Sequence, residues 1–222
     1  MASGAPPGAA AAAPDALTAA AAPPGAASPA LRADVERLAS LLDDGGRRYL
    51  TRDWRPALEA VRAASGEVES LFVRLVALGD PAELLSVAAP LGATGFHWAV
   101  AFDLILPLDA FSAMADALRR AAEAVGAPEV ILSSCAFAAG LAHCATANDF
   151  DLARPLLERA LALRTRVLGA TSREALDAQL MLGVCRYSQG AYAEAEGVLR
   201  AAYDGRKRLL GPGDASTLLT LQ

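Results

Sequence analysis

Apolar and small side chains recur at steps of three and four along residues 189–211, whose sequence is QGAYAEAEGVLRAAYDGRKRLLG. Tyr192, Ala195, Leu199 and Ala202 fall on one face of an α-helix at that spacing. The two alanines in this face let a neighbouring helix approach closely, while the two larger side chains fill the spaces between them. The pattern therefore predicts a helix that packs closely against a neighbour.

The ends of this helix are marked by residues with known preferences for helix ends. Gly190 is suited to a tight turn before the helix, and Gly211 to its C-terminus. Arg206, Lys207 and Arg208 lie in the last turn, where cations interact favourably with the helix dipole.

The same face occurs 42 residues earlier in the chain, where Leu168-Gly169 corresponds to Leu210-Gly211. Such self-similarity at a fixed period is typical of repeat proteins. The shift of 42 carries Phe150, Ala153, Leu157 and Ala160 onto Tyr192, Ala195, Leu199 and Ala202. Weaker matches lie upstream, at Phe111, Met114, Leu118 and Ala121 and at Trp54, Ala57, Val61 and Ala64. For these two, an ordinary alanine-rich amphipathic helix is the alternative interpretation.

A second helical pattern precedes the packing helix, over residues 172–190, and Ser172 can cap its N-terminus. Each unit is then a helix, a turn at Gly190, a second helix and a Leu-Gly exit. Stacking such pairs buries a continuous core between neighbours. We therefore predict an all-α fold, a right-handed superhelical solenoid of antiparallel helix pairs from about Leu31 onward.

This unit resembles the tetratricopeptide repeat, in which a Leu-Gly pair and an aromatic residue in the first helix precede Gly, Tyr and two alanines. The residues that match this pattern are Leu182, Gly183, Gly190, Tyr192, Ala195, Leu199 and Ala202. The period of 42 and the Leu-Gly exit resemble the kinesin-light-chain type of repeat. Arg186 stands at the aromatic site, with Tyr187 beside it, and Met181 stands where that type usually has Asn.

Composition and repeat together divide the chain into three parts. Residues 1–30 contain one charge, six prolines and fifteen alanines, and we predict a disordered tail, with an unusual plastid transit peptide as the alternative. Residues 31–92 form a degenerate helical region. Residues 93–222 hold the repeats, as a degenerate unit at 93–126, full units at 128–169 and 170–211, and the truncated start of another at 212–222.

The last of these parts ends inside a first helix, so the apolar face of the unit before it would lack a partner or a polar cap. We expect the chain to belong to a longer protein, or this end to be completed by another subunit through self-association.

The bulk properties exclude several classes of partner. A net charge of −5 and a pI near 5.1 disfavour nucleic acid, which is bound by clustered Lys and Arg. The most apolar run, residues 96–106, is shorter than the roughly 18 residues of a membrane span, and it predicts a buried helix. Three cysteines are too few for a disulfide framework, which favours a cytoplasmic location.

The sequence lacks the motifs of common enzymes. It has no phosphate-binding loop and no nucleophile elbow. His143 and Cys144, with Cys135 before them, lack the spacing of metal ligands on one helix face. We therefore predict no catalytic residues, no cofactor and no metal.

The resemblance implies a binding module, because the first helices of tetratricopeptide arrays line a concave groove that holds a peptide or a partner helix. Carried over to this chain, the groove positions are Asp177, Leu180, Val184, Tyr187 and Ser188 in one unit and Cys135, Ala138, Ala142, Ala145 and Thr146 in the preceding one. This lining is small and nearly uncharged, which favours an apolar or aromatic ligand. The alternatives are that these residues only pack, and that Tyr187 fills the core in place of the aromatic missing at Arg186.

Two further functions remain open from the sequence. The repeats could be the sensor or scaffold region of a larger signalling protein such as an NTPase. They could also belong to a kinesin-light-chain-like cargo adaptor, which would need a heptad coiled coil before the repeats. The only candidate, ALRADVERLASLLDD, is about two heptads long.

Overall fold

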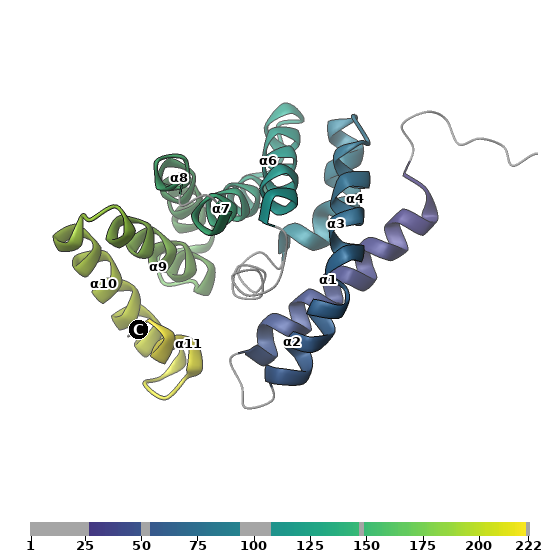
Figure 1. Cartoon of the computed structure of the whole chain (residues 1–222). Coiled ribbons are helices and arrows are strands. Elements are labelled where there is room, and N and C mark those ends of the chain that lie inside the picture. The colour runs from purple at the N-terminus through teal and green to yellow at the C-terminus, as the bar shows by residue number, and fades with distance from the viewer. Residues whose placement is uncertain (1–26, 50–53, 94–107, 147–148, 221–222) are drawn as a thin grey trace, which may run out of the picture.

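The computed structural model describes residues 27–49, 54–93, 108–146 and 149–220. Within these ranges the chain is built from helices and contains no strand. The helices are α1 (Pro29–Tyr49), α2 (Trp54–Ala63), α3 (Ser65–Val76), α4 (Pro81–Ala93), α6 (Leu108–Ala124), α7 (Glu129–Thr146), α8 (Phe150–Leu168), α9 (Arg173–Ser188), α10 (Tyr192–Leu210) and α11 (Ala215–Leu219). They follow one another along an arc, with α7 and α9 nearer its inner side and α8 and α10 nearer its outer side (Figure 1). The predicted all-α solenoid of helix pairs is confirmed.

The first described helix begins slightly earlier than the sequence predicts. Ser28 Oγ accepts a hydrogen bond from the Leu31 amide at 3.1 Å, and Pro29 is the first helical residue. The predicted disordered tail therefore overlaps α1 at Pro29 and Ala30. Its residues 1–26 and the predicted buried helix over residues 96–106 lie outside the described residues.

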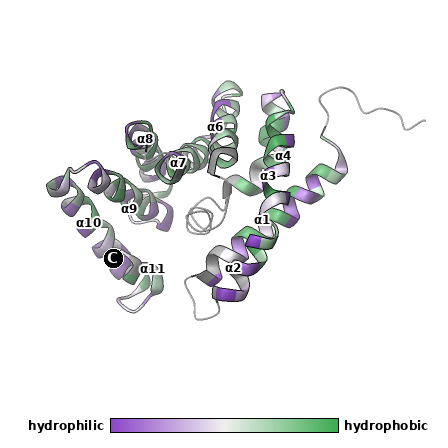
Figure 2. Ribbon diagram, in the orientation of Figure 1, coloured by the Kyte–Doolittle hydropathy of each residue, from purple (hydrophilic) through white to green (hydrophobic). Residues whose placement is uncertain are grey.

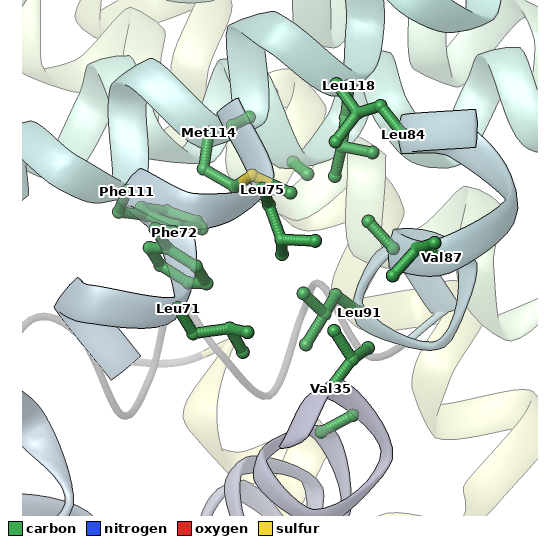
Figure 3. Close-up of a cluster of buried hydrophobic side chains, with 14 of the residues drawn as sticks. Val35, Leu71, Phe72, Leu75, Leu84, Val87, Leu91, Phe111, Met114 and Leu118 are labelled. Carbon is green, nitrogen blue, oxygen red and sulfur yellow. The ribbon is translucent and has the colours of Figure 1, made fainter. Parts of the chain in front are cut away.

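The N-terminal helices and the start of the repeats share one hydrophobic core. Val35 of α1, Leu71 of α3, Leu91 of α4 and Met114 of α6 point into this cluster (Figure 3). It continues to α7, where Ala138 and Ala142 belong to it. The heptad-like segment of α1 is therefore packed against its own chain, through α2, α3 and α4.

The helices that have neighbours on several sides are the ones that are hydrophobic along most of their length. Helix α7 contacts α4, α6, α8 and α9, so it has neighbours on several sides. Helices α4 and α7 are hydrophobic along most of their length, whereas α1 and α10 alternate between hydrophobic and hydrophilic residues (Figure 2). A helix that is apolar nearly all round is one that is covered nearly all round.

The helix ends in the repeat region agree with the sequence. Ser172 Oγ accepts a hydrogen bond from the Ala175 amide at 3.2 Å, which caps α9. Gly190 has φ of +80° in the turn before α10, and both Gly169 and Gly211 have φ of +93° after their helices. These are backbone conformations that side chains with a Cβ rarely adopt.

Candidate interaction surface

Three of the predicted groove residues on α9 are exposed. Val184 is 38% exposed and Tyr187 is 60% exposed, and Ser188 lies beside them at the end of the helix. The Tyr187 ring meets the Tyr192 ring edge-on, with 5.2 Å between centroids. Tyr187 is therefore a surface side chain, and the alternative that it fills the core is wrong.

Two other predicted groove residues on α9, Asp177 and Leu180, are buried. The Asp177 carboxylate accepts a hydrogen bond from Arg206 Nη2, and both side chains of this ion pair are almost fully buried. Burial raises the pKa of the Asp177 carboxyl, and the guanidinium of Arg206 opposes that rise. Asp177 is therefore buried in an internal ion pair, whereas the sequence predicts it at the groove surface.

The groove positions predicted on α7 are misplaced by one residue. Gly140 lies against Leu157, as Gly183 lies against Leu199: a Cβ on either glycine would fall within 2.9 Å of the leucine side chain. The leucines are 42 positions apart, but the glycines are 43 apart, because α7 has one residue more than α9 between this glycine and the end of the helix.

This extra residue shifts the first helix of the earlier unit by one position relative to its second helix. The counterparts of Leu180, Val184 and Tyr187 are therefore Phe137, Leu141 and Cys144. Ala138 and Ala142 are buried in the core, Cys135 is buried as well, and Ala145 is half-buried. For Thr146 only the backbone, at the end of α7, is described. The sequence analysis missed this because it applied the 42-residue shift of the second helices to the first helices as well.

The true counterparts on α7 are covered by the next helix. Phe137 and Leu141 are each about 1% exposed, and they belong to a cluster that includes Ala178, Leu182 and Cys185 of α9. On α9, Leu180 is buried but Val184 is exposed, and the only described helix after α10 is the five-residue α11.

A pocket of about 650 Å³ lies on this open side of α10. Its lining residues are Tyr187, Tyr192, Ala195, Glu196, Leu199, Arg200, Tyr203, Asp204 and Thr220. Tyr192 is 63% exposed, so it does not fill a space between packed helices as the sequence predicts. Its counterpart Phe150 is half-buried against α9. Of the other signature residues, Gly190 is exposed in its turn. The rest are buried or half-buried: Ala153, Leu157, Ala160, Leu182, Gly183, Ala195, Leu199 and Ala202.

Two buried arginines join each unit to the next, a role that the charge pattern does not predict. Arg164 Nη1 donates to the Glu174 carbonyl oxygen at 2.8 Å, and Arg206 Nη1 donates to the Ser216 carbonyl oxygen at 2.8 Å. The Arg164 guanidinium also lies 3.9 Å from the centroid of the Phe137 ring. Burial lowers the pKa of Arg164 to about 10 against the opposing charge of Asp177. Sequence comparison could have found this pair, since the arginines are 42 positions apart.

His143 and the three cysteines, which the sequence offers as candidate metal ligands, do not form a metal site among the described residues. His143 Nε2 lies 3.2 Å from Asp116 Oδ2, and the three thiols are free. Burial raises the pKa of Cys144 to about 12, with a further contribution from the neighbouring Cys185, and that of Cys135 to about 11. Within the described ranges, no group of three or more His, Cys, Asp or Glu side chains could hold a metal. None of the helices described is long and apolar enough to cross a bilayer.

Part of the chain matches a known protein family. Residues 132–208, which run from α7 to α10, match the family described as tetratricopeptide repeat. This part of the chain is therefore similar to tetratricopeptide repeats, which generally mediate protein–protein interactions.

A solved structure extends the likeness beyond the matched residues. The crystal structure of BtubC (BKLC) from P. vanneervenii is similar with a TM-score of 0.52, over 87% of this chain and 82% of that chain, at 15% identity. At this identity the likeness shows a shared fold. No curated protein matches the chain.

Proposed function

We propose that this chain is a non-catalytic interaction scaffold that binds a peptide or a partner helix on the inner face of α9. The observation that carries the proposal is the exposure of Val184 and Tyr187 on a helix whose other faces are packed. A tyrosine on a concave surface offers a large apolar ring together with a hydroxyl that can fix the backbone of a ligand. Ser188 adds a second hydroxyl at the same end of the helix.

The non-catalytic part of the proposal is supported by the partners of the ionisable groups. Asp177 is paired with Arg206, and His143 lies beside Asp116, so these groups have structural partners. The free thiols support a cytoplasmic location. The sequence left two wider functions open, a region of a larger signalling protein and a kinesin-light-chain-like cargo adaptor. The adaptor is disfavoured, because it needs a coiled coil before the repeats and the candidate segment, α1, packs into the core instead.

Selection of peptides from a random display library against the whole chain tests this function. We expect enriched peptides to lose about fivefold or more in affinity for Tyr187→Ala, the effect of an aromatic hot spot. Leu152→Ala is the matched control, since Leu152 is 52% exposed on α8. Both side chains are exposed, so neither change should alter stability by more than about 0.5 kcal/mol. Failure to enrich any peptide, or equal losses for the two variants, would refute the proposal.

A further inference from the structure

We infer that Cys144 and Cys185 form a redox-sensitive pair, in which a hydroperoxide converts the two thiols into a disulfide that joins α7 to α9. Both thiols are free, and they belong to the first helices of successive repeat units. The inference goes beyond the proposed function, because it concerns the contact between two units and not the ligand that they bind.

The two side chains are neighbours in the hydrophobic cluster between the units. Cys185 of α9 is fully buried in this cluster, and the half-buried Cys144 packs against it from the end of α7. The two thiols are also hydrogen-bonded to each other. Thiols in contact need only a small approach of their helices to reach the geometry of a disulfide, so this contact carries the inference.

Cys185 is the thiol that attacks the oxidant. Burial raises the pKa of both thiols, but at Cys185 the hydrogen bond from Cys144 and the charge of Arg154 act in the opposite direction. Glu158 and Asp151 raise the pKa of Cys185 by smaller amounts. The same hydrogen bond adds to the effect of burial at Cys144, whose pKa is about 12. The larger thiolate fraction is therefore at Cys185, and the thiolate is the nucleophile.

A pocket beside α8 brings a small oxidant close to Cys185. This pocket of about 530 Å³ is lined in part by Phe150 and Arg154. Cys185 Sγ donates a hydrogen bond to the carbonyl oxygen of Phe150 at 3.6 Å. The pocket and the thiol therefore contact the same residue, and Arg154, which favours the thiolate, lies on the side from which the oxidant approaches.

The reaction balances with one equivalent of hydroperoxide. The Cys185 thiolate attacks a peroxide oxygen, the O–O bond breaks, and the hydroxide or alkoxide that leaves takes up a proton. The sulfur of Cys144 then attacks the sulfur of the Cys185 sulfenic acid, and an S–S bond forms as the S–O bond breaks. The departing hydroxide takes the Cys144 proton as water. The two thiols have lost two electrons, and the peroxide has been reduced to water, or to water and an alcohol.

The product suits its surroundings and fixes the end of α9. A disulfide is uncharged and has no donor, so the burial that disfavours a thiolate does not oppose it. Tyr187 and Ser188 follow Cys185 by two and three residues, and oxidation would therefore hold the part of α9 that carries them. The disulfide also closes a loop between α7 and α9, which restricts the unfolded chain and stabilises the folded one.

Mass spectrometry of the whole chain after treatment with hydrogen peroxide tests the inference. The product should be a monomer that is lighter by two hydrogen atoms, and peptide mapping should locate its cross-link between Cys144 and Cys185. Cys135→Ala is the matched control, because Cys135 is also buried on α7 but belongs to the other hydrophobic cluster. This variant should cross-link like the wild type. A chain without a cross-link, or with a link to Cys135, would refute the inference.

Trapping with dimedone and a change of charge test the order of the steps. Cys144→Ala removes the thiol that consumes the sulfenic acid, so dimedone should label Cys185 about tenfold more in this variant than in the wild type. Arg154→Met should slow the cross-linking about two- to threefold, whereas Arg159→Met, at another exposed position on α8, should not. The inference fails if the label does not rise, if the two arginine variants react alike, or if the oxidised chain unfolds at lower urea than the reduced one.

Discussion

Removing the carboxylate of Asp177 should destabilise the C-terminal unit far more than removing any exposed carboxylate. Arg206 is 1% exposed, and it donates to Asp177, to the Ser216 carbonyl at 2.8 Å and to Thr220 Oγ1 at 3.2 Å. This one guanidinium therefore links α10 to α9 and to α11. Asp177→Ala leaves a buried charge without its counter-ion.

The cost arises from burial rather than from the attraction between the two charges. Breaking a buried ion pair from one side costs about 3–5 kcal/mol, because the remaining charge stays out of water. Replacing both members by apolar residues is often nearly neutral. Asp177→Leu combined with Arg206→Met should therefore lie within about 2 kcal/mol of the wild type, since the Ser216 carbonyl loses one hydrogen bond. The coupling between the two substitutions would be large.

Urea-induced unfolding and hydrogen exchange measure these effects together. We expect amides of α9 and α10 to exchange about a hundredfold faster or more in Asp177→Ala, because about 1.4 kcal/mol corresponds to a factor of ten. Asp34→Ala is the control, since it breaks an exposed pair with Arg74 at 2.8 Å and should cost at most about 1 kcal/mol. If the two single variants unfold alike, the buried pair does not link the unit as argued.

Two further predictions concern close contacts and thiol chemistry. Gly183→Ala would place a Cβ 2.6 Å from Leu199 Cδ2 and should lower stability by about 1–3 kcal/mol, whereas Gly197→Ala, in open space within α10, should raise it by about 0.5–1 kcal/mol. Equal melting temperatures would contradict this. With a pKa of about 12, Cys144 should react with iodoacetamide near pH 8 roughly a thousandfold more slowly than in the unfolded chain. The Cys144 rate should still rise about tenfold per pH unit up to about pH 10, whereas the rate of an ordinary thiol has levelled off by then. Mass spectrometry of the alkylated chain measures this rate, and a Cys144 rate that levels off like that of an ordinary thiol would contradict the prediction.

The repeat face and the helix caps could be predicted from the sequence because they depend on local spacing. Ala195 and Ala202 are buried as predicted, and Ser172 caps α9. The surroundings of each residue depend instead on which helix comes next along the solenoid. Tyr192 has the pattern of a packing residue but is exposed, because no described helix covers that part of α10. Periodicity alone contains no information on which unit is the last to be covered.

The errors on α7 and at Asp177 have different physical origins. One extra residue between Gly140 and the end of α7 moved the first helix out of the register of the second. An extra residue at the end of a helix does not change the spacing of apolar positions within either helix. Asp177 falls at a groove position by spacing, but Arg206 lies opposite it in space and removes it from the surface. Whether the exposed Val184 and Tyr187 contact a ligand stays a prediction.

Successive units are joined by hydrogen bonds from an arginine side chain to the main chain of the next unit. Arg164 and Arg206 each bind a carbonyl oxygen ten residues further along, at Glu174 in one case and Ser216 in the other. Any amino acid carries that oxygen, so the joint specifies a distance along the chain and leaves the side chain there free to vary. Units joined in this way are interchangeable parts, and an array can be lengthened or given new recognition residues while each coupling stays the same.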